Sequence, residues 1–289
     1  PVDIELVKPA LDALYQTVTG SFAFLPTSNE QTFNLQQVSW YEFGQNISLS
    51  YDALLAPWVD ARTVPAVPMS DQILFAEARP AYAQFRFHGF QSGRLYDLPQ
   101  FPFDNRMAQV MVFQTADFPG FGDDTPFGFV GQAQLLKNIL ANGLDPAQCA
   151  KPYVGTVTPL PFLPWINYEQ VFCAQPQIIQ FPGVQGIRYL SYYSQGPNPV
   201  LDNQVFYTFQ GLTDDGQFYI SALFPVETGI FPTEPPSCPK CGVADYNPFE
   251  EWAAVLREQL RQLNALAAND FAPSLTVLDE VVKSLQTKQ

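Results

Sequence analysis

The chain has 289 residues, a formal net charge of −14 and a pI near 4.3. This length can bury one large core or two modest ones. The acidic charge repels phosphate backbones and anionic lipid headgroups, which argues against nucleic acid as a partner. Only 15% of the residues are charged, against a usual figure of about 25%, so we expect a surface of uncharged polar residues, as on extracellular proteins.

Several features favour an exported protein. The sequence has no apolar stretch of about eighteen residues that could cross a membrane. It opens with Pro1, as expected after removal of a signal segment or from trimming. Asn46-Ile47-Ser48 matches the glycosylation acceptor pattern, which often arises by chance. We expect a secreted or cell-surface protein, with a membrane contact only through an anchor outside this chain.

The first part of the chain divides into a terminal segment and a hairpin. Residues 1–32 are expected to be helical or extended, because apolar residues recur at three- and four-residue spacing despite Pro9. Residues 33–51 alternate in two runs around Phe43-Gly44-Gln45-Asn46, which predicts a β-hairpin. Prolines at 57, 65, 68 and 80 predict an irregular connector with few ladder hydrogen bonds over Pro57–Pro80.

The middle of the chain reads as strands around one helix. Residues 82–90 and 108–115 alternate as strands do. A short helix is expected from about Val130 to Leu140, ended by Asn142-Gly143.

Two hairpins are predicted between Gln170 and Val226. The second turns at Thr213-Asp214-Asp215-Gly216, where an aspartate can bond the backbone and the glycine can adopt positive φ. We interpret the Asp-Asp pair as turn chemistry and not as a calcium site, because the further oxygen ligands of an EF-hand-like loop are missing.

A proline-rich connector, residues 225–247, precedes two amphipathic helices. Asn247 can cap the first helix, Pro248 suits its first position, and Glu250 suits a capping box. Two helices alone make no independent core, so residues 33–289 are expected to form a single domain. The expected apolar stripes are Phe249, Trp252, Ala253, Leu256, Leu260 and Leu263, then Leu275, Leu278, Val282 and Leu285.

These elements predict an α+β fold. We expect a twisted, mainly antiparallel β-sheet of about seven or eight strands, with an N-terminal hairpin, one mid-chain helix and two C-terminal helices covering a face.

The four cysteines, Cys149, Cys173, Cys238 and Cys241, allow three interpretations. Two structural disulfides are favoured, with the pairing Cys149–Cys173 and Cys238–Cys241, because an even count suits an exported chain. The alternative is a zinc site of all four thiolates, for which Cys238-x-x-Cys241 supplies one knuckle and a second is missing. Redox catalysis by this Cys-x-x-Cys is the third, although five residues separate it from the following helix cap.

No catalytic or cofactor motif is evident. His88 is the single histidine, so any Ser-His-Asp triad must use it, and a lone histidine within a strand is usually structural. There is no nucleophile elbow, dinucleotide fingerprint or Walker loop. We therefore name no catalytic residue, no cofactor and no resident metal, and an enzyme is the less favoured hypothesis.

Five aromatic residues gather near the first long hairpin, and exposed rings can stack on sugars or anchor an interface. Core packing is the favoured alternative, because aromatics are good strand residues. The candidate binding surface consists of Trp165, Tyr168, Tyr189, Tyr192 and Tyr193.

The second hairpin, Phe206 to Ala222, preceded by Gly186 to Leu190, resembles a group of uncharacterised exported bacterial lipoproteins. The resemblance covers about residues 33–286 and implies export and lipid anchoring but no activity. This chain has no lipidated N-terminal cysteine, which departs from the pattern. Element order is also similar to Mog1/PsbP-like domains, by analogy only. Further stretches that resemble the lipoprotein group are Ile47 to Tyr51, Thr63-Val64-Pro65-Ala66 and Gln170-Val171-Phe172.

The leading hypothesis is an exported or cell-surface, non-catalytic binding or structural protein. Its partners would be other protein chains or carbohydrate. One variant is self-assembly, through an extended N-terminal segment or an open sheet edge. The alternative is a secreted enzyme, with a hydrolase-like site of carboxylates and tyrosines or a Cys-x-x-Cys redox centre.

Overall fold

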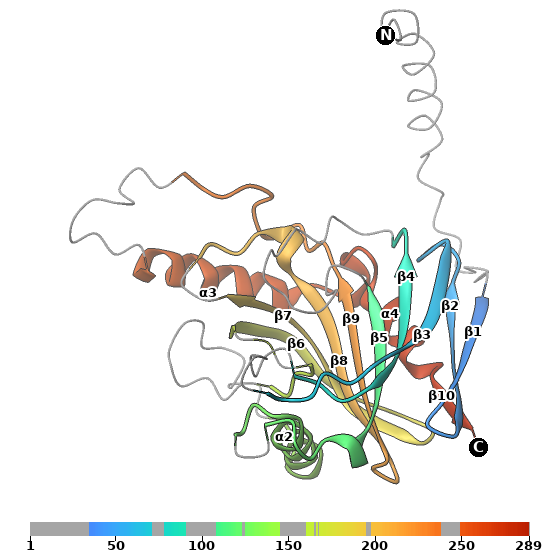
Figure 1. Ribbon diagram of the computed structural model, residues 1–289. Helices are drawn as coiled ribbons and strands as arrows, with labels where there is room; N and C mark the ends of the chain where they lie inside the picture. The colour runs from blue at the N-terminus through green and yellow to red at the C-terminus, as the bar shows by residue number, and fades with distance from the viewer. Residues whose placement is uncertain are drawn as a thin grey trace, which may run out of the picture. The chain divides into compact units, whose positions relative to one another are not determined.

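The structure is a computed structural model with an α+β fold (Figure 1). The described part contains three α-helices and ten β-strands in two antiparallel sheets, which confirms the predicted fold class. It lies within one compact unit, residues 34–289. The expected terminal segment 1–32 lies outside the described residues. The structure describes residues 35–70, 78–90, 108–122, 125–144, 160–164, 166, 168–194, 198–237 and 249–288.

The larger sheet has seven strands in the order β3-β4-β5-β9-β8-β7-β6. All neighbouring strands run antiparallel. β3 and β6 are therefore its two edges. The strands are β3 (Trp58–Val64), β4 (Tyr82–His88), β5 (Gln109–Gln114), β6 (Glu169–Phe181), β7 (Val184–Ser194), β8 (Phe206–Thr213) and β9 (Phe218–Pro225).

The smaller sheet contains the predicted hairpin. β1 (Leu35–Glu42) and β2 (Gln45–Asp52) are joined by the two-residue turn Phe43-Gly44, in which both residues have positive φ. Such a turn matches the natural twist of a hairpin. The short strand β10 (Gln286–Lys288) pairs with the other side of β2, so the two ends of the described chain meet in one sheet.

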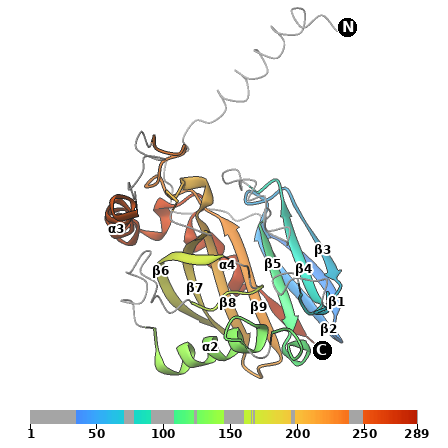
Figure 2. The same ribbon diagram turned by 60° about the vertical axis from the view of Figure 1, so that its left-hand side comes forward.

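Alternation along the strands of the larger sheet divides the apolar side chains between two cores. On β5, Val110 and Val112 enter one core, while Met111 and Phe113 enter the other. The first core is covered by α3 (Phe249–Ala265) and α4 (Leu275–Lys283), and the second by α2 (Phe129–Asn142). Figures 1 and 2 show these helices on opposite sides of the sheet. Three short 3₁₀ turns complete the described elements: Thr115–Asp117, Asp202–Gln204 and Ala268–Asp270.

Several local signals act as the sequence predicts. α2 ends at Gly143, whose φ is 83° and whose N–H donates to the Ile139 carbonyl at 2.9 Å. The β8–β9 turn closes through Asp215, whose Oδ1 accepts from Thr213 Oγ1 at 2.6 Å and from the Gln217 amide at 3.0 Å. The Asp-Asp pair therefore includes turn chemistry, as expected.

One prediction about the connector is wrong. Within Pro57–Pro80, residues 58–64 form a regular strand that pairs with β4 along its whole length. Pro57 and Pro65 stand on either side of this strand, so no missing amide interrupts the ladder. The position at a sheet edge also suits a strand bounded by prolines.

A buried ionic contact ties α4 to the sheet. Tyr207 Oη donates to Asp279 Oδ1 at 2.9 Å, and Arg188 Nε lies 3.5 Å from the same oxygen. Arg188 also donates to the Gln175 carbonyl and to Gln177 Oε1. Burial raises the pKa of Asp279, while Arg188 and Tyr207 act in the opposite direction. The buried guanidinium and carboxylate thus depend on each other.

Candidate functional site

A row of mostly polar side chains runs along one face of the paired strands β3 and β4. Cross-strand neighbours in the register are Trp58 with His88, Asp60 with Arg86, and Arg62 with Gln84. Since side chains alternate along a strand, these six share one face of the sheet. We call these six residues, Trp58, Asp60, Arg62, Gln84, Arg86 and His88, the polar ladder.

The first cross-strand pair of the polar ladder, Trp58 with His88, is an aromatic stack. The rings of Trp58 and His88 are nearly parallel, with centroids 3.6 Å apart and 6° between their planes. The Trp58 side chain is nevertheless 52% exposed. A large indole thus stays open to solvent at the sheet edge, held against a neighbouring ring.

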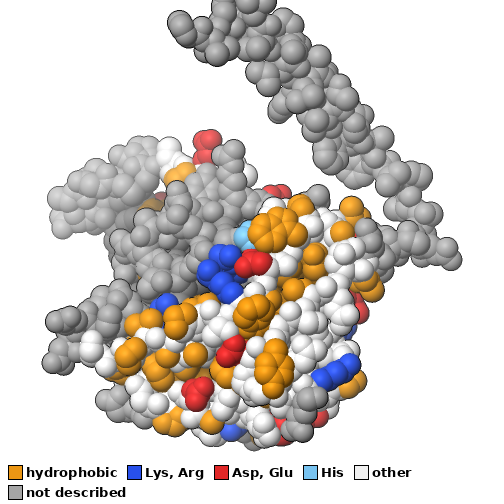
Figure 3. All heavy atoms as spheres, turned by 45° about the vertical axis from the view of Figure 1, so that its right-hand side comes forward, with side chains coloured by type: hydrophobic (Ala, Val, Ile, Leu, Met, Phe, Trp, Pro, Cys, Tyr) orange, Lys and Arg blue, Asp and Glu red, His pale blue; other side chains and the backbone are white. Residues whose placement is uncertain are grey.

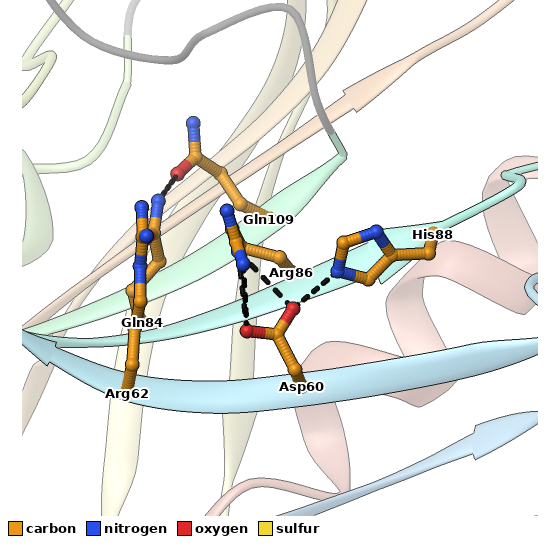
Figure 4. Close-up of polar contacts among 6 residues, drawn as sticks. All are labelled: Asp60, Arg62, Gln84, Arg86, His88 and Gln109. Carbon is orange, nitrogen blue, oxygen red and sulfur yellow. Dashed lines mark hydrogen bonds and ion pairs between the residues drawn. The ribbon is translucent and has the colours of Figure 1, made fainter.

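The carboxylate of Asp60, in the middle of the polar ladder, has polar contacts with two side chains (Figure 4). Arg86 reaches it with two nitrogens, Nε at 3.1 Å from Oδ1 and Nη2 at 2.9 Å from Oδ2, and His88 Nε2 pairs with Oδ1. Burial tends to raise the pKa of Asp60, but the hydrogen bonds from Arg86 and His88 outweigh it, so this pKa lies below its usual value. Asp60 is therefore a fixed carboxylate at neutral pH.

Arg62 is paired across the strands with Gln84, and Gln84 is hydrogen-bonded to Gln109 on β5 (Figure 4). The Arg62 Nε donates to Gln84 Oε1 at 2.7 Å, and Gln84 Nε2 donates to Gln109 Oε1 at 2.5 Å. Both glutamines are buried, whereas Arg62 is only partly buried. The Nη groups of Arg62 have no partner among the described residues. The chain of amides fixes one side of the guanidinium and leaves the other side available.

Viewed from outside, the ladder lies on an accessible face. Figure 3 shows the histidine beside arginine, acidic and hydrophobic side chains, with apolar groups continuing over the same face. The chain has only 14 lysines and arginines, so two arginines and the single histidine on one strand pair are a local concentration. These features make the ladder a site with donors, one acceptor and a flat apolar surface.

Three of the five residues in the candidate aromatic surface are buried, in agreement with the favoured interpretation of core packing. Tyr189, Tyr192 and Tyr193 are buried, and Tyr189 and Tyr193 belong to one core while Tyr192 belongs to the other. The idea of exposed rings is thereby corrected for these three, because consecutive strand residues point into cores on both sides of a central strand. Tyr168 packs half-buried against the second core, and Trp165 lies outside the described residues.

Three glutamine side chains, of which Gln132 and Gln210 are buried, bind the backbone of the 160–163 segment. Three backbone N–H groups of the 160–163 segment each donate to a glutamine side chain from another element. These hydrogen bonds satisfy backbone groups that would otherwise lack a partner away from water. The three bonds run from Leu160 N to Gln170 Oε1 (2.9 Å), from Phe162 N to Gln132 Oε1 (2.7 Å), and from Leu163 N to Gln210 Oε1 (3.0 Å).

Only one predicted cysteine falls within the described residues. Cys173 is buried on β6 and is disulfide-bonded. Cys149, Cys238 and Cys241 lie outside the described residues, so the pairing stays a prediction. A disulfide at Cys173 does not fit a zinc site of all four thiolates. In the part of the chain that the structure describes, no group of three or more His, Cys, Asp or Glu side chains is placed to hold a metal.

The sequence interpretation missed the ladder. Trp58, Asp60 and Arg62 fell in the expected connector, and His88 was taken for a structural histidine. A signal was present, since Trp58-x-Asp60-x-Arg62 and Gln84-x-Arg86-x-His88 both place polar or aromatic groups at every second position. What the sequence lacked was the pairing of these two segments.

The chain matches no protein-family model, no curated protein and no solved structure. The resemblances to exported lipoproteins and to Mog1/PsbP-like domains therefore stay predictions. None of the described helices has both the length and the apolar character needed to cross a membrane.

Proposed function

We propose that this protein is an exported or cell-surface, non-catalytic binding protein, and that its ligand binds on the polar ladder. The observation that carries the proposal is the exposed indole of Trp58, stacked on His88 beside charged side chains that are already positioned. A flat apolar ring flanked by fixed polar groups is typical of ligand-binding surfaces. Such pre-positioned groups lose little conformational entropy when a ligand binds.

The geometry supports binding better than catalysis. The carboxylate of Asp60 is occupied by Arg86 and His88, and one face of His88 is covered by Trp58. Among the described residues, His88 has no hydroxyl or thiol partner that it could activate. The tyrosine–carboxylate pair Tyr207–Asp279 is buried, so it gives little support to the enzyme alternative.

The cysteines and the composition support an extracytoplasmic location. A disulfide at Cys173 suits an oxidising compartment, and the low fraction of charged residues is in keeping with it. We retain the pairing Cys149–Cys173 and Cys238–Cys241 as part of the proposal.

Self-assembly is a second proposal, favoured by one edge of the larger sheet. Among the described strands, β6 pairs only with β7, and its Ile178 is exposed. An open strand edge with an apolar side chain can receive a strand from another copy. Size-exclusion chromatography with light scattering tests this, and a monomer at millimolar concentration contradicts it.

The binding proposal is tested with a panel of neutral oligosaccharides, acidic oligosaccharides and extended peptides, measured by biolayer interferometry. We expect at least one class to bind the wild type and to lose most of its affinity with Trp58→Ala. Tyr41→Ala is the matched control, because Tyr41 is an exposed strand aromatic in the other sheet. If no class distinguishes Trp58→Ala from Tyr41→Ala, the proposal is wrong.

A further inference from the structure

The guanidinium of Arg62 is prepared to receive an anion. Its Nε is held at 2.7 Å by Gln84, which is itself held by Gln109. Neither Nη group has a partner among the described residues, and the side chain is only partly buried. Two parallel N–H donors in a fixed plane fit a carboxylate, which accepts both at once.

The charge of Arg62 is not neutralised within the ladder. Asp60 is the acidic member, and it is paired with Arg86 and His88. The ladder therefore carries one cation in excess even with His88 neutral, on a chain whose net charge is −14. A single excess cation on an acidic protein suits an anionic group on a small ligand, and it does not suit a long polyanion such as nucleic acid or a charged membrane.

The indole of Trp58 supplies a second contact in line with Arg62. The two residues lie four positions apart on the same face of β3, which corresponds to about 13 Å. The C–H face of a sugar ring is apolar and packs on an indole, while its hydroxyl groups remain available for hydrogen bonds. Asp60 lies between the two contacts, with its carboxylate already held by Arg86 and His88.

We propose that the polar ladder binds a short acidic oligosaccharide along β3, with one sugar ring stacked on Trp58 and the carboxylate of another ring paired with Arg62. This inference rests on the proposed function and names the ligand class of the same site. The separation of Trp58 and Arg62 requires more than one ring, so a single sugar acid cannot make both contacts.

Isothermal titration calorimetry with trigalacturonate and maltotriose tests the inference, because maltotriose is an α-1,4-linked trisaccharide that has no carboxylate. We expect trigalacturonate to bind more tightly, and its affinity to fall as salt rises. Galacturonate alone should bind more weakly than the trimer. Arg62→Gln should lower the affinity for trigalacturonate about tenfold or more, since it removes a charge-assisted pair.

Two further variants keep the test decisive. Arg257→Gln is the control, because it removes the same charge from an exposed position on α3. Arg62→Lys retains the positive charge but not the two parallel N–H donors of the guanidinium. We therefore expect its affinity for trigalacturonate to lie between those of the wild type and Arg62→Gln. If maltotriose binds as tightly as trigalacturonate, or if Arg62→Gln keeps the affinity of the wild type for trigalacturonate, the proposal of an acidic ligand is wrong. The proposed binding function is not contradicted by either result. Failure of trigalacturonate to bind also overturns the inference, and the wider panel then decides the proposed function.

Discussion

His88 lies flat against the indole of Trp58, with 3.6 Å between the ring centroids. Because Trp58 is about half exposed, we expect the stack to contribute little to stability and more to binding. Trp58→Ala should lower the free energy of unfolding by about 0.5–1.5 kcal/mol, the range for an aromatic pair. Urea denaturation checks this against Tyr41→Ala. A loss above about 3 kcal/mol would mean that the ring has a structural role instead.

The pairing of Asp60 predicts a dependence on acid. Its folded pKa is lowered, so its contribution to stability is fully present above its usual value near 3.8 and disappears as the pH falls through the lower folded pKa. Asp60→Asn should be less stable than the wild type at pH 7, and the difference should shrink in this acidic window. Urea midpoints measured at pH 7 and at acidic pH provide the comparison, and a constant difference contradicts the assignment.

The buried pair of Arg188 and Asp279 predicts strong coupling. Arg188→Met leaves the buried carboxylate without its counter-charge and should destabilise the protein by about 3–5 kcal/mol. Adding Asp279→Asn should recover part of this loss, because no unpaired charge then remains. A double-mutant cycle by chemical denaturation measures the coupling. Additive effects of the two substitutions would show that the pair is energetically unimportant.

For Asp279 the pH dependence has the opposite sign to that of Asp60. Burial raises its folded pKa, so ionised Asp279 costs stability at higher pH, and this cost is relieved as the pH falls through the folded pKa toward the ordinary carboxyl range. The stability of the wild type relative to Asp279→Asn should therefore be higher at mildly acidic pH than at pH 8. Unfolding midpoints of both proteins across this interval give the sign directly.

Gln210 predicts a large effect for an uncharged residue. Its Oε1 accepts from Leu163 N and Tyr219 Oη, and its Nε2 donates to Thr208 Oγ1 and Ser221 Oγ. Gln210→Leu leaves several buried groups without partners and should cost about 2–4 kcal/mol. Gln134→Leu on the exposed face of α2 should change stability by less than about 0.5 kcal/mol. Equal costs would contradict the importance of the network.

The cysteines give a chemical prediction. If all four are joined in disulfides, alkylation without reductant adds nothing to the intact mass, and alkylation after reduction adds four groups. Peptide mapping then tests the pairing Cys149–Cys173. Four adducts on the unreduced, unfolded protein would exclude the disulfides.

Much of the fold was predictable because local signals agreed with it. The Thr213–Gly216 turn, the stop of α2 at Gly143 and the stripes of the last two helices all follow from turn chemistry and periodicity. The apolar stripes of α3 and α4 do enter a sheet-covering core, as expected.

The rest depended on long-range pairing, which sequence alone does not provide. β3 was missed because the density of prolines outweighed a seven-residue stretch that contains none. β10 is only three residues long and owes its strand form to β2. The ladder exists only because Trp58 pairs with His88, 30 positions away, and a shift of one residue would send both rings to the opposite face.

The central claim is that a ligand binds across Trp58 and Arg62. The most direct test records the Trp58 indole N–H and the Arg62 Nε–H signals by ¹H–¹⁵N NMR while trigalacturonate is added. We predict that both signals shift together and saturate at one common concentration, whereas the indole signal of Trp252 on α3 stays in place. Saturable binding with both ladder signals unmoved would contradict the claim.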